Sequence, residues 1–229
     1  MIIYGKQVCL YALSKHENKI KTIFLSKQGI LPQDIFDKYR PKIKFLENKW
    51  AQAKSKGGNH QGILIEIDEF QQSNFEDIKY GKFIVILDSL TDVGNIGAIV
   101  RTAYALGVDA IIASGVKQLN YGAITRTSSG ALLDMPFMLS KNILDDLNEL
   151  SQIGFKSYGA SSNGVDIKEC ECADKKLLVL GSEGDGLSKK VKTKIDNFVS
   201  IKMKREFDSL NVSVAGAILI DRIGNARRE

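Results

Sequence analysis

The sequence predicts an α/β protein in two parts: a small N-terminal α/β domain and a larger α/β domain built on a mostly parallel sheet. Two observations lead to this prediction. Short apolar runs alternate with helix-like segments along nearly the whole chain, as they do in layered α/β folds with helices on both faces of the sheet. A polar stretch at residues 69–82 separates two series of such elements and is typical of a linker between domains.

The first domain is expected to span residues 1–68 and to alternate strands with helices. Pro32 is expected in the first turn of a helix, where its missing N–H would have no helical partner in any case. Helices are predicted at residues 6–14, 32–39 and 47–54, and strands at 20–25, 43–46 and 62–67.

The second domain, residues 83–229, begins with a strand at 83–87 that is apolar throughout, as expected of a strand buried on both faces. The next helix, at residues 95–106, carries apolar side chains with the spacing of an amphipathic helix, namely Ile96, Ile99, Val100 and Ala103. Further strands are predicted at 108–113, 135–139, 155–160, 177–180 and 198–201, and further helices at 143–153 and 209–223.

A glycine-rich turn follows the apolar strand at 177–180. Its glycines, Gly181, Gly184 and Gly186, let the backbone approach a ligand closely because they lack Cβ. A dinucleotide site would need G-x-G-x-x-G and an acidic residue after the next strand. The glycine spacing here differs, and Lys202 follows the next strand, so a Rossmann-type nucleotide enzyme is disfavoured. A plain connecting turn is the simpler alternative.

Composition narrows the class of protein further. The net charge of +5 and the pI of about 8.9 are compatible with binding nucleic acid. We expect neither a membrane span nor a signal peptide, because the apolar runs are too short. The chain has three cysteines, Cys9, Cys170 and Cys172. Their odd number, and a spacing unlike that of a disulfide framework, indicate a reducing, cytoplasmic location. With only two histidines in the chain, we expect no metal site.

The glycine turn at 181–186 together with Ser209-Leu210-Asn211 resembles the SpoU (TrmH-like) family of RNA ribose 2′-O-methyltransferases, within the knotted SPOUT superfamily. Asn95 and Arg101 fall on the functional positions of a further family motif, D-x-x-N-x-G-x-x-x-R. Residues 126–131 resemble another, K-x-S-x-G-A. The resemblance covers nearly the whole chain, and it implies an α/β fold with a trefoil knot in the second domain.

The resemblance implies S-adenosylmethionine as the methyl donor, wrapped by three loops at residues 180–184, 201–203 and 209–211. The donor-binding residues would be Leu180, Gly181, Glu183, Gly184, Ile201, Met203, Ser209, Leu210 and Asn211. It likewise implies a homodimer, which from the residues themselves is supported only by the apolar faces of the helices at 95–106 and 209–223.

The catalytic residues implied by the resemblance are Asn95, Arg101, Glu183, Ser209 and Asn211. A guanidinium group has a pKa above about 12 and rarely gives up its proton. We therefore expect Arg101 to clamp a phosphate or the developing alkoxide, with Glu183 positioning it or accepting a hydrogen bond. The simpler alternatives are that Asn95 caps its helix and that Arg101 forms a surface ion pair.

The RNA substrate is implied by two N-terminal segments, residues 3–6 and 59–62, which look like the RNA-binding module of the branch acting on large-subunit ribosomal RNA. A guanosine of 23S ribosomal RNA is the expected target, transfer RNA is the next candidate, and a non-catalytic RNA-binding module is a third. The expected RNA-binding residues are His60, Arg101, Arg126, Lys202 and Arg205. For His60, a hydrogen bond within its own turn is the alternative.

One donor loop departs from the family pattern I-P-M-x-G, because here it is Ile201-Lys202-Met203-Lys204-Arg205. Proline stiffens a loop and glycine permits positive φ. If the family path needs positive φ at residue 205, arginine there costs on the order of 1 kcal/mol. The alternative is a different, unstrained path. The new cations, Lys202, Lys204 and Arg205, could reach RNA phosphates in either case.

Overall fold

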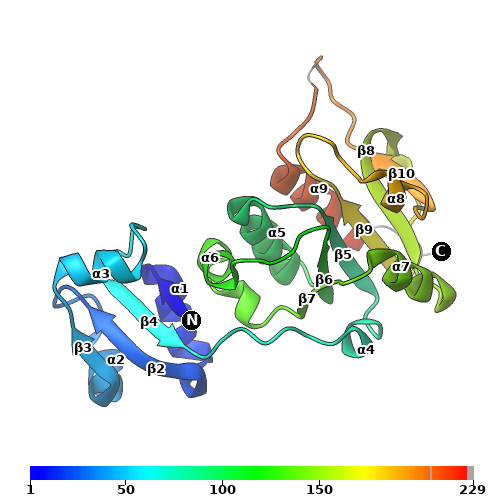
Figure 1. The fold of residues 1–229 in the computed structure, drawn as a ribbon. Coiled ribbons are helices and arrows are strands. Elements are labelled where there is room, and N and C mark those ends of the chain that lie inside the picture. Colours follow the sequence, from blue (N-terminus) through cyan, green and yellow to red (C-terminus); the bar gives the residue numbers. More distant parts are fainter. Residues whose placement is uncertain (207, 226–229) are drawn as a thin grey trace. The chain divides into compact units, whose positions relative to one another are not determined.

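The computed structural model describes residues 1–206 and 208–225, which divide into two compact units (Figure 1). The first unit comprises Met1–Gln71 together with Asn120–Leu133, and the second comprises Gln72–Leu119 and the chain from Asp134 onward. The predicted α/β class, with a mostly parallel sheet in the larger part, is confirmed.

The first unit is built on a four-stranded sheet in the order β1-β4-β2-β3. The central pair, β2 (Ile20–Leu25) and β4 (Ile63–Ile67), is antiparallel; β1 (Ile2–Tyr4) is antiparallel to β4, and β3 (Ile43–Phe45) is parallel to β2. The sheet also contains one strand that the sequence did not predict, β1, which is only three residues long.

Helices cover both faces of this sheet. The larger core includes apolar residues of α1 (Lys6–Lys15) and α2 (Gln33–Tyr39) packed on one face. On the other face α3 (Asn48–Lys54) packs through Ala51 against Phe24 and Leu64. The predicted helices are confirmed within a residue or two at each end. Pro32, however, lies just before α2 as its N-cap residue, so the prediction that it sits in the first turn was one residue out.

The second unit is built on a six-stranded sheet in which every pair of neighbouring strands is parallel, in the order β10-β8-β9-β5-β6-β7. The two central strands, β5 (Phe83–Asp88) and β9 (Lys176–Leu180), are buried along their whole length. This burial explains their nearly continuous apolar sequence. The outer strands are β6 (Ala110–Ser114), β7 (Phe137–Leu139), β8 (Lys156–Asp166) and β10 (Asn197–Ser200).

Helices cover both faces of the six-stranded sheet. On one face α5 (Val93–Ala105) and α9 (Val212–Gly224) lie side by side (Figure 1), and Gly216 of α9 approaches Leu180 and Ile99 so closely that a Cβ there would lie 2.9 Å from Leu180 Cδ1. On the other face α4 (Phe75–Ile78), α7 (Ile143–Gln152) and α8 (Lys189–Lys192) contribute apolar side chains to a single core with β5, β6 and β9.

The expected linker at 69–82 has structure of its own. Besides α4, its backbone and side chains pair with β7: Ser73 N–H donates to the Phe137 carbonyl at 3.0 Å, and the Gln72 amide oxygen accepts from Leu139 N–H at 2.8 Å. Apolar side chains of α4, Phe75 and Ile78, explain why this polar stretch is not a free tether, since both pack into the core of the second unit.

The segment from Asn120 to Leu133, which the sequence analysis placed in the second domain, packs with the first unit. It contains α6 (Tyr121–Thr127), which the sequence did not predict. Tyr121 stacks on Phe70 with ring centroids 4.8 Å apart, and the Arg126 guanidinium lies 5.2 Å from the centre of the Tyr4 ring. Gly130 has φ of +99°, and a Cβ there would lie 2.5 Å from Tyr11, so this position requires glycine.

The helix N-termini nearest the glycine turn are held by side-chain caps. Asp92 caps α5, its Oδ1 accepting from Asn95 N–H at 2.7 Å, so the alternative that Asn95 is the cap of this helix is ruled out. Asn211 caps α9, which therefore begins at Val212 rather than at Ser209 as predicted.

Inside α6, a threonine side chain bonds to the helix backbone: Thr125 Oγ1 donates to the Tyr121 carbonyl.

We expect Asp92→Ala to lower the free energy of unfolding by about 1 kcal/mol, because it removes the only side-chain acceptor that the α5 cap provides. Asp92→Ser keeps a capping oxygen and should cost much less. Chemical denaturation of the two variants would check this. An equal loss of stability in both would mean that Asp92 acts through something other than its cap.

Candidate active site

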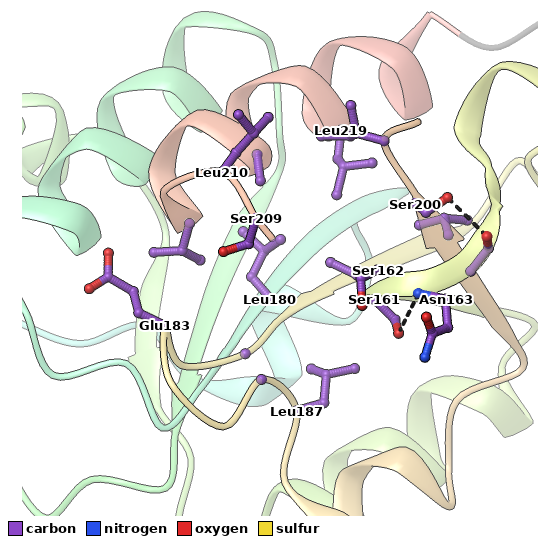
Figure 2. Close-up of a pocket in the computed structure, with 18 of the residues that line it drawn as sticks. Ser161, Ser162, Asn163, Leu180, Glu183, Leu187, Ser200, Ser209, Leu210 and Leu219 are labelled. Carbon is purple, nitrogen blue, oxygen red and sulfur yellow. Dashed lines mark hydrogen bonds between the residues drawn. The ribbon is translucent and has the colours of Figure 1, made fainter. Parts of the chain in front are cut away.

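A pocket of about 1010 Å³ opens beyond the carboxyl ends of β8, β9 and β10 (Figure 2). Ligands of open parallel sheets characteristically bind at this edge, and the volume is at the upper end for small-molecule sites. All nine of the residues predicted to bind the donor line this pocket: Leu180, Gly181, Glu183, Gly184, Ile201, Met203, Ser209, Leu210 and Asn211. The three loops named from sequence therefore meet around one cavity.

The pocket is lined by both apolar and polar side chains. Figure 2 shows Leu210 and Leu219 in its upper part and Leu180 near the centre, whereas Ser161 and Asn163 come from β8. Such a surface suits a ligand that has both an apolar ring and polar groups.

The glycine turn is closed on itself. Ser182 N–H donates to the Gly186 carbonyl at 3.0 Å, and Gly186 N–H donates back to the Ser182 carbonyl at 3.1 Å. A Cβ on Gly181 would lie 2.1 Å from the carbonyl carbon of Gly186, so only glycine fits there. This closure leaves Glu183 at the exposed tip of the turn, at the rim of the pocket.

Three of the predicted catalytic side chains bond to one another at this rim. Asn95 Nδ2 and Asn211 Nδ2 donate to the same carboxylate oxygen, Glu183 Oε1, at 2.7 and 2.8 Å. Asn211 Nδ2 also donates to Asn95 Oδ1 at 3.0 Å, which closes the triangle. These contacts join the N-terminal ends of α5 and α9 to the glycine turn, so the rim is a cross-linked structure and not three independent loops.

The orientation of Asn211 follows from its role as a cap. Its Oδ1 accepts from Ser213 N–H at 2.9 Å and from Ser213 Oγ at 2.6 Å. With the oxygen occupied by the first turn of α9, the Nδ2 group is left to face Glu183 and Asn95. The cap therefore fixes the orientation of the Asn211 amide, so that Nδ2 and not Oδ1 faces Glu183 and Asn95.

The pocket is acidic. Among its described lining residues, five carboxylates, Asp166, Glu169, Glu183, Asp185 and Asp208, stand against two ammonium groups, those of Lys192 and Lys202. An excess of carboxylates attracts a cationic ligand and repels a ligand that carries phosphates. A sulfonium compound such as S-adenosylmethionine fits this donor set, and a pyrophosphate-bearing dinucleotide does not.

Arg101 is placed differently from the other predicted catalytic residues. It is exposed on α5 and is not among the described residues that line the pocket. Arg101 follows Asn95 by six positions, which turns it roughly 120° around the helix from that residue. Glu183, Ser209 and Asn211 thus line the pocket, and Asn95 joins them through its hydrogen bonds to Glu183 and Asn211. Arg101 is left on another face of α5.

The predicted RNA-binding residues are scattered. Lys202 is exposed and lines the pocket, and Arg205 is exposed in the same loop. Arg126 is half-buried in the first unit. His60 is buried, and its Nδ1 accepts from Gly62 N–H at 3.0 Å, which is the geometry of the turn alternative. Its contact with RNA stays a prediction.

The strain considered at Arg205 is absent. The described non-glycine residues with positive φ are Lys56, Gln61, Ser89 and Ser129. Arg205 is described and is not one of them, so the loop takes the unstrained alternative path.

Sequence reasoning missed the polar end of the pocket. The strand at 155–160 was expected to stop at Ala160, whereas β8 continues to Asp166 through Ser161-Ser162-Asn163-Gly164. Such residues normally signal a turn and concealed the strand. Gly164 could have been a signal, because glycine inside a strand marks close backbone approach; a Cβ there would lie 2.5 Å from the Val199 carbonyl carbon of β10.

Comparison with known families settles the relationship. The family described as "SpoU rRNA Methylase family" matches residues 82–221, more than half of the chain. The chain belongs to the SpoU rRNA methylase family. A second family, "RNA 2′-O ribose methyltransferase substrate binding", matches residues 2–73. The resemblance noted from the glycine turn and the Ser209-Leu210-Asn211 segment is thereby confirmed.

Two curated relatives illustrate the range of this SpoU family. The 23S rRNA (guanosine-2′-O-)-methyltransferase RlmB of Neisseria meningitidis serogroup B is 31% identical over 193 residues, which cover 81% of this chain and 77% of the relative. A protein of Borreliella burgdorferi named uncharacterized tRNA/rRNA methyltransferase is 34% identical over 183 residues, covering 73% of this chain and 80% of that protein.

Solved structures of methyltransferases share the fold. The SpoU methyltransferase AviRb of Streptomyces viridochromogenes, solved in complex with AdoMet, has a TM-score of 0.78 at 21% identity and covers 98% of this chain and 89% of its own. An AdoMet-bound rRNA methyltransferase of Sinorhizobium meliloti has a TM-score of 0.78 at 23% identity, covering 97% and 85%. At these identities the likeness establishes the architecture.

Proposed function

We propose that this protein transfers the methyl group of S-adenosylmethionine to a ribose 2′-hydroxyl of RNA, on a guanosine of 23S ribosomal RNA. The observation that carries the proposal is the acidic pocket at the carboxyl edge of the parallel sheet, lined by all nine predicted donor residues and closed at its rim by the Glu183–Asn95–Asn211 triangle. The 31% identity to a 23S rRNA guanosine methyltransferase supports the choice of substrate.

The residues of this chain would position the reactants. The donor, when bound, supplies a methyl group already activated by its positive sulfur. Aligning a hydroxyl with that methyl can contribute roughly 7–11 kcal/mol toward the barrier, so no strong base is required. The triangle would hold the pocket rim in shape, Ser209 would contact donor or ribose, and Arg101 would clamp the target phosphate or the developing alkoxide. The 2′-hydroxyl distinguishes RNA from DNA and is also the nucleophile.

A homodimer forms part of this proposal, as does the trefoil knot implied by the resemblance. The apolar faces of α5 and α9 pack within the chain, through Ile99 and Gly216 among others, so they no longer argue for a dimer by themselves. The large apolar side chains that stay exposed on these helices, or directly after α5, are Tyr104, Leu106 and Val214. A second copy seated on these residues would form the proposed dimer.

A cytoplasmic location also belongs to the proposal. Among the described residues, no helix is both long and apolar enough to cross a membrane. Within the same residues, no cluster of three His, Cys, Asp or Glu side chains is suited to hold a metal ion.

The proposal is tested by methyl transfer. Ribosomal RNA from a strain lacking the protein would be incubated with the purified protein and donor labelled in the methyl group, and the modified position would then be mapped. We expect label on a single 23S guanosine ribose. Label on a base, or none on any RNA, would refute the proposal.

Transfer RNA is the second candidate substrate, favoured by relatives such as a Staphylococcus haemolyticus protein named putative TrmH family tRNA/rRNA methyltransferase, which is 33% identical over 182 residues. Including transfer RNA from the same strain in the transfer assay separates the two. The non-catalytic module would bind RNA and transfer nothing.

We expect Arg205→Gly to leave donor affinity within about twofold of the unmodified protein, because the residue stores no backbone strain in this loop. RNA binding should weaken, with a salt dependence shallower by about one phosphate contact. Calorimetry with the donor and a salt titration of RNA binding would measure both. An unchanged salt slope would rule out a phosphate contact at Arg205.

A further inference from the structure

The α3 face of the first unit combines exposed aromatic surface with unpaired cations. Trp50, the only tryptophan in the chain, is 58% exposed on α3. Residues 38–56 carry seven basic side chains against one acidic side chain, Glu47. A large aromatic side chain that is exposed to solvent among lysines does not contribute to a hydrophobic core. Such a surface suits a ligand with flat rings and negative charge.

The sheet beneath α3 presents a continuous row of side chains. Strand register places Tyr4 beside Leu64, Leu64 beside Phe24, and Phe24 beside Lys44 across β1, β4, β2 and β3. Residues directly paired in neighbouring strands point to the same face, so this row lies on the α3 side. It runs from an aromatic ring at one edge to an exposed lysine at the other.

Cations lie over this row and beside Trp50. The Lys54 ammonium is 4.5 Å from the centre of the Phe24 ring, and the Lys49 ammonium is 5.7 Å from the centre of the Trp50 ring. Trp50 and Lys54 are four residues apart in α3 and are therefore neighbours on the helix surface. At the β1 edge the Arg126 guanidinium covers the Tyr4 ring at 5.2 Å.

The lysines of this face are available to an external anion. Lys44, Lys49 and Lys54 are exposed, and none of them forms an ion pair with a carboxylate in the described part of the chain. Neighbouring cations are in contrast engaged within the protein: Lys38 pairs with Glu17 at 2.6 Å, and Lys42 donates to the Ile20 carbonyl at 2.7 Å.

We propose that the α3 face is a platform for single-stranded RNA, on which Trp50 stacks an unpaired base while Lys44, Lys49 and Lys54 contact the flanking phosphates. A base has a flat apolar face that matches an exposed indole, and the adjoining phosphates match the lysines. A paired helix would offer the phosphates without a free base face. The inference rests on the proposed RNA substrate and names which part of that RNA the first unit holds.

Trp50 reports on its own occupancy, because it is the only tryptophan. The probes are a single-stranded oligoadenylate and a self-paired RNA hairpin of equal length, added without donor to the full-length protein. We expect the oligoadenylate to quench Trp50 emission and the hairpin to do so far less. Trp50→Ala should weaken oligoadenylate binding roughly tenfold, equivalent to about 1.4 kcal/mol, and Trp50→Phe should largely restore it.

Phe45→Ala is the matched control, because Phe45 is 55% exposed on the neighbouring β3 but lies against Phe36, with ring centroids 6.5 Å apart, on the opposite side of the sheet. It should bind oligoadenylate as the unmodified protein does. Lys54→Gln should reduce the salt slope by about one. The platform would be overturned if oligoadenylate left Trp50 emission of the unmodified protein unquenched and bound Trp50→Ala with unchanged affinity. Quenching that depends on protein concentration alone would also overturn it, because this result would indicate a second copy on this face.

This test separates the platform from the proposed function. If Trp50→Ala loses RNA affinity but transfers methyl groups at the normal rate under saturating RNA, both stand. If quenching fails while transfer to RNA proceeds, only the platform falls. If oligoadenylate quenches Trp50 and no RNA accepts a methyl group, the platform stands and the methyltransferase proposal falls.

Discussion

Arg101→Ala is expected to lower kcat by about 100- to 1000-fold while leaving donor affinity unchanged within about twofold. The proposed clamp role predicts this loss, because the variant would remove a positive charge from the point where the alkoxide develops. Donor affinity is preserved because Arg101 is exposed on α5 and is not among the described residues that line the donor pocket. Calorimetry with the donor and single-turnover methyl transfer would measure the two quantities separately.

Two variants sharpen the Arg101 experiment. Arg101→Lys keeps the charge but loses the planar fork, so it distinguishes a bidentate clamp from a simple cation. Arg222→Ala removes another exposed arginine from the same unit, on α9, and controls for the loss of net charge. A strong loss of donor affinity in Arg101→Ala would contradict the clamp role, and equal effects of Arg101→Ala and Arg222→Ala would reduce it to general electrostatics.

The strands that carry the second unit were predictable because burial leaves a clear mark on sequence. Residues 83–87 and 177–180 are apolar at every position, and they became β5 and β9 at the centre of the sheet. Short or polar elements leave no such mark. The three residues of β1 are too few to show a period, and the end of β8, which lines the pocket, contains serine, asparagine and glycine, residues that normally signal a turn.

The motifs predicted which residues meet at the pocket rim, but they did not predict the hydrogen bonds among them. Asn95, Glu183 and Asn211 lie 88 and 28 residues apart in order along the chain, so no local pattern relates them. Their contacts arise from packing α5 against α9 on one face of the sheet. Asp92 was missed as the cap of α5 because the motif drew attention to Asn95 instead. Burial of His60 likewise depends on the folded turn.

The rim triangle makes Glu183 the second position where a large effect is expected. Its Oε1 accepts from both Asn95 and Asn211, and hydrogen bonds to an ionised group contribute about 1.5–3 kcal/mol when buried and less when exposed, as here. Glu183→Ala should therefore weaken donor binding roughly tenfold, since the glycine turn loses its tie to α5 and α9.

Glu183→Gln separates charge from geometry at the same position. The glutamine carbonyl oxygen can accept both amide donors, so the triangle is kept while one of the pocket's five carboxylates disappears. If the triangle matters through shape, Glu183→Gln binds the donor nearly normally and only Glu183→Ala is weak. If the negative charge attracts the cationic donor, both variants are weak, and the loss in Glu183→Gln shrinks as salt is raised because screening already weakens that attraction. Calorimetry across a salt series distinguishes the two, and normal donor binding in Glu183→Ala would show that the triangle serves neither purpose.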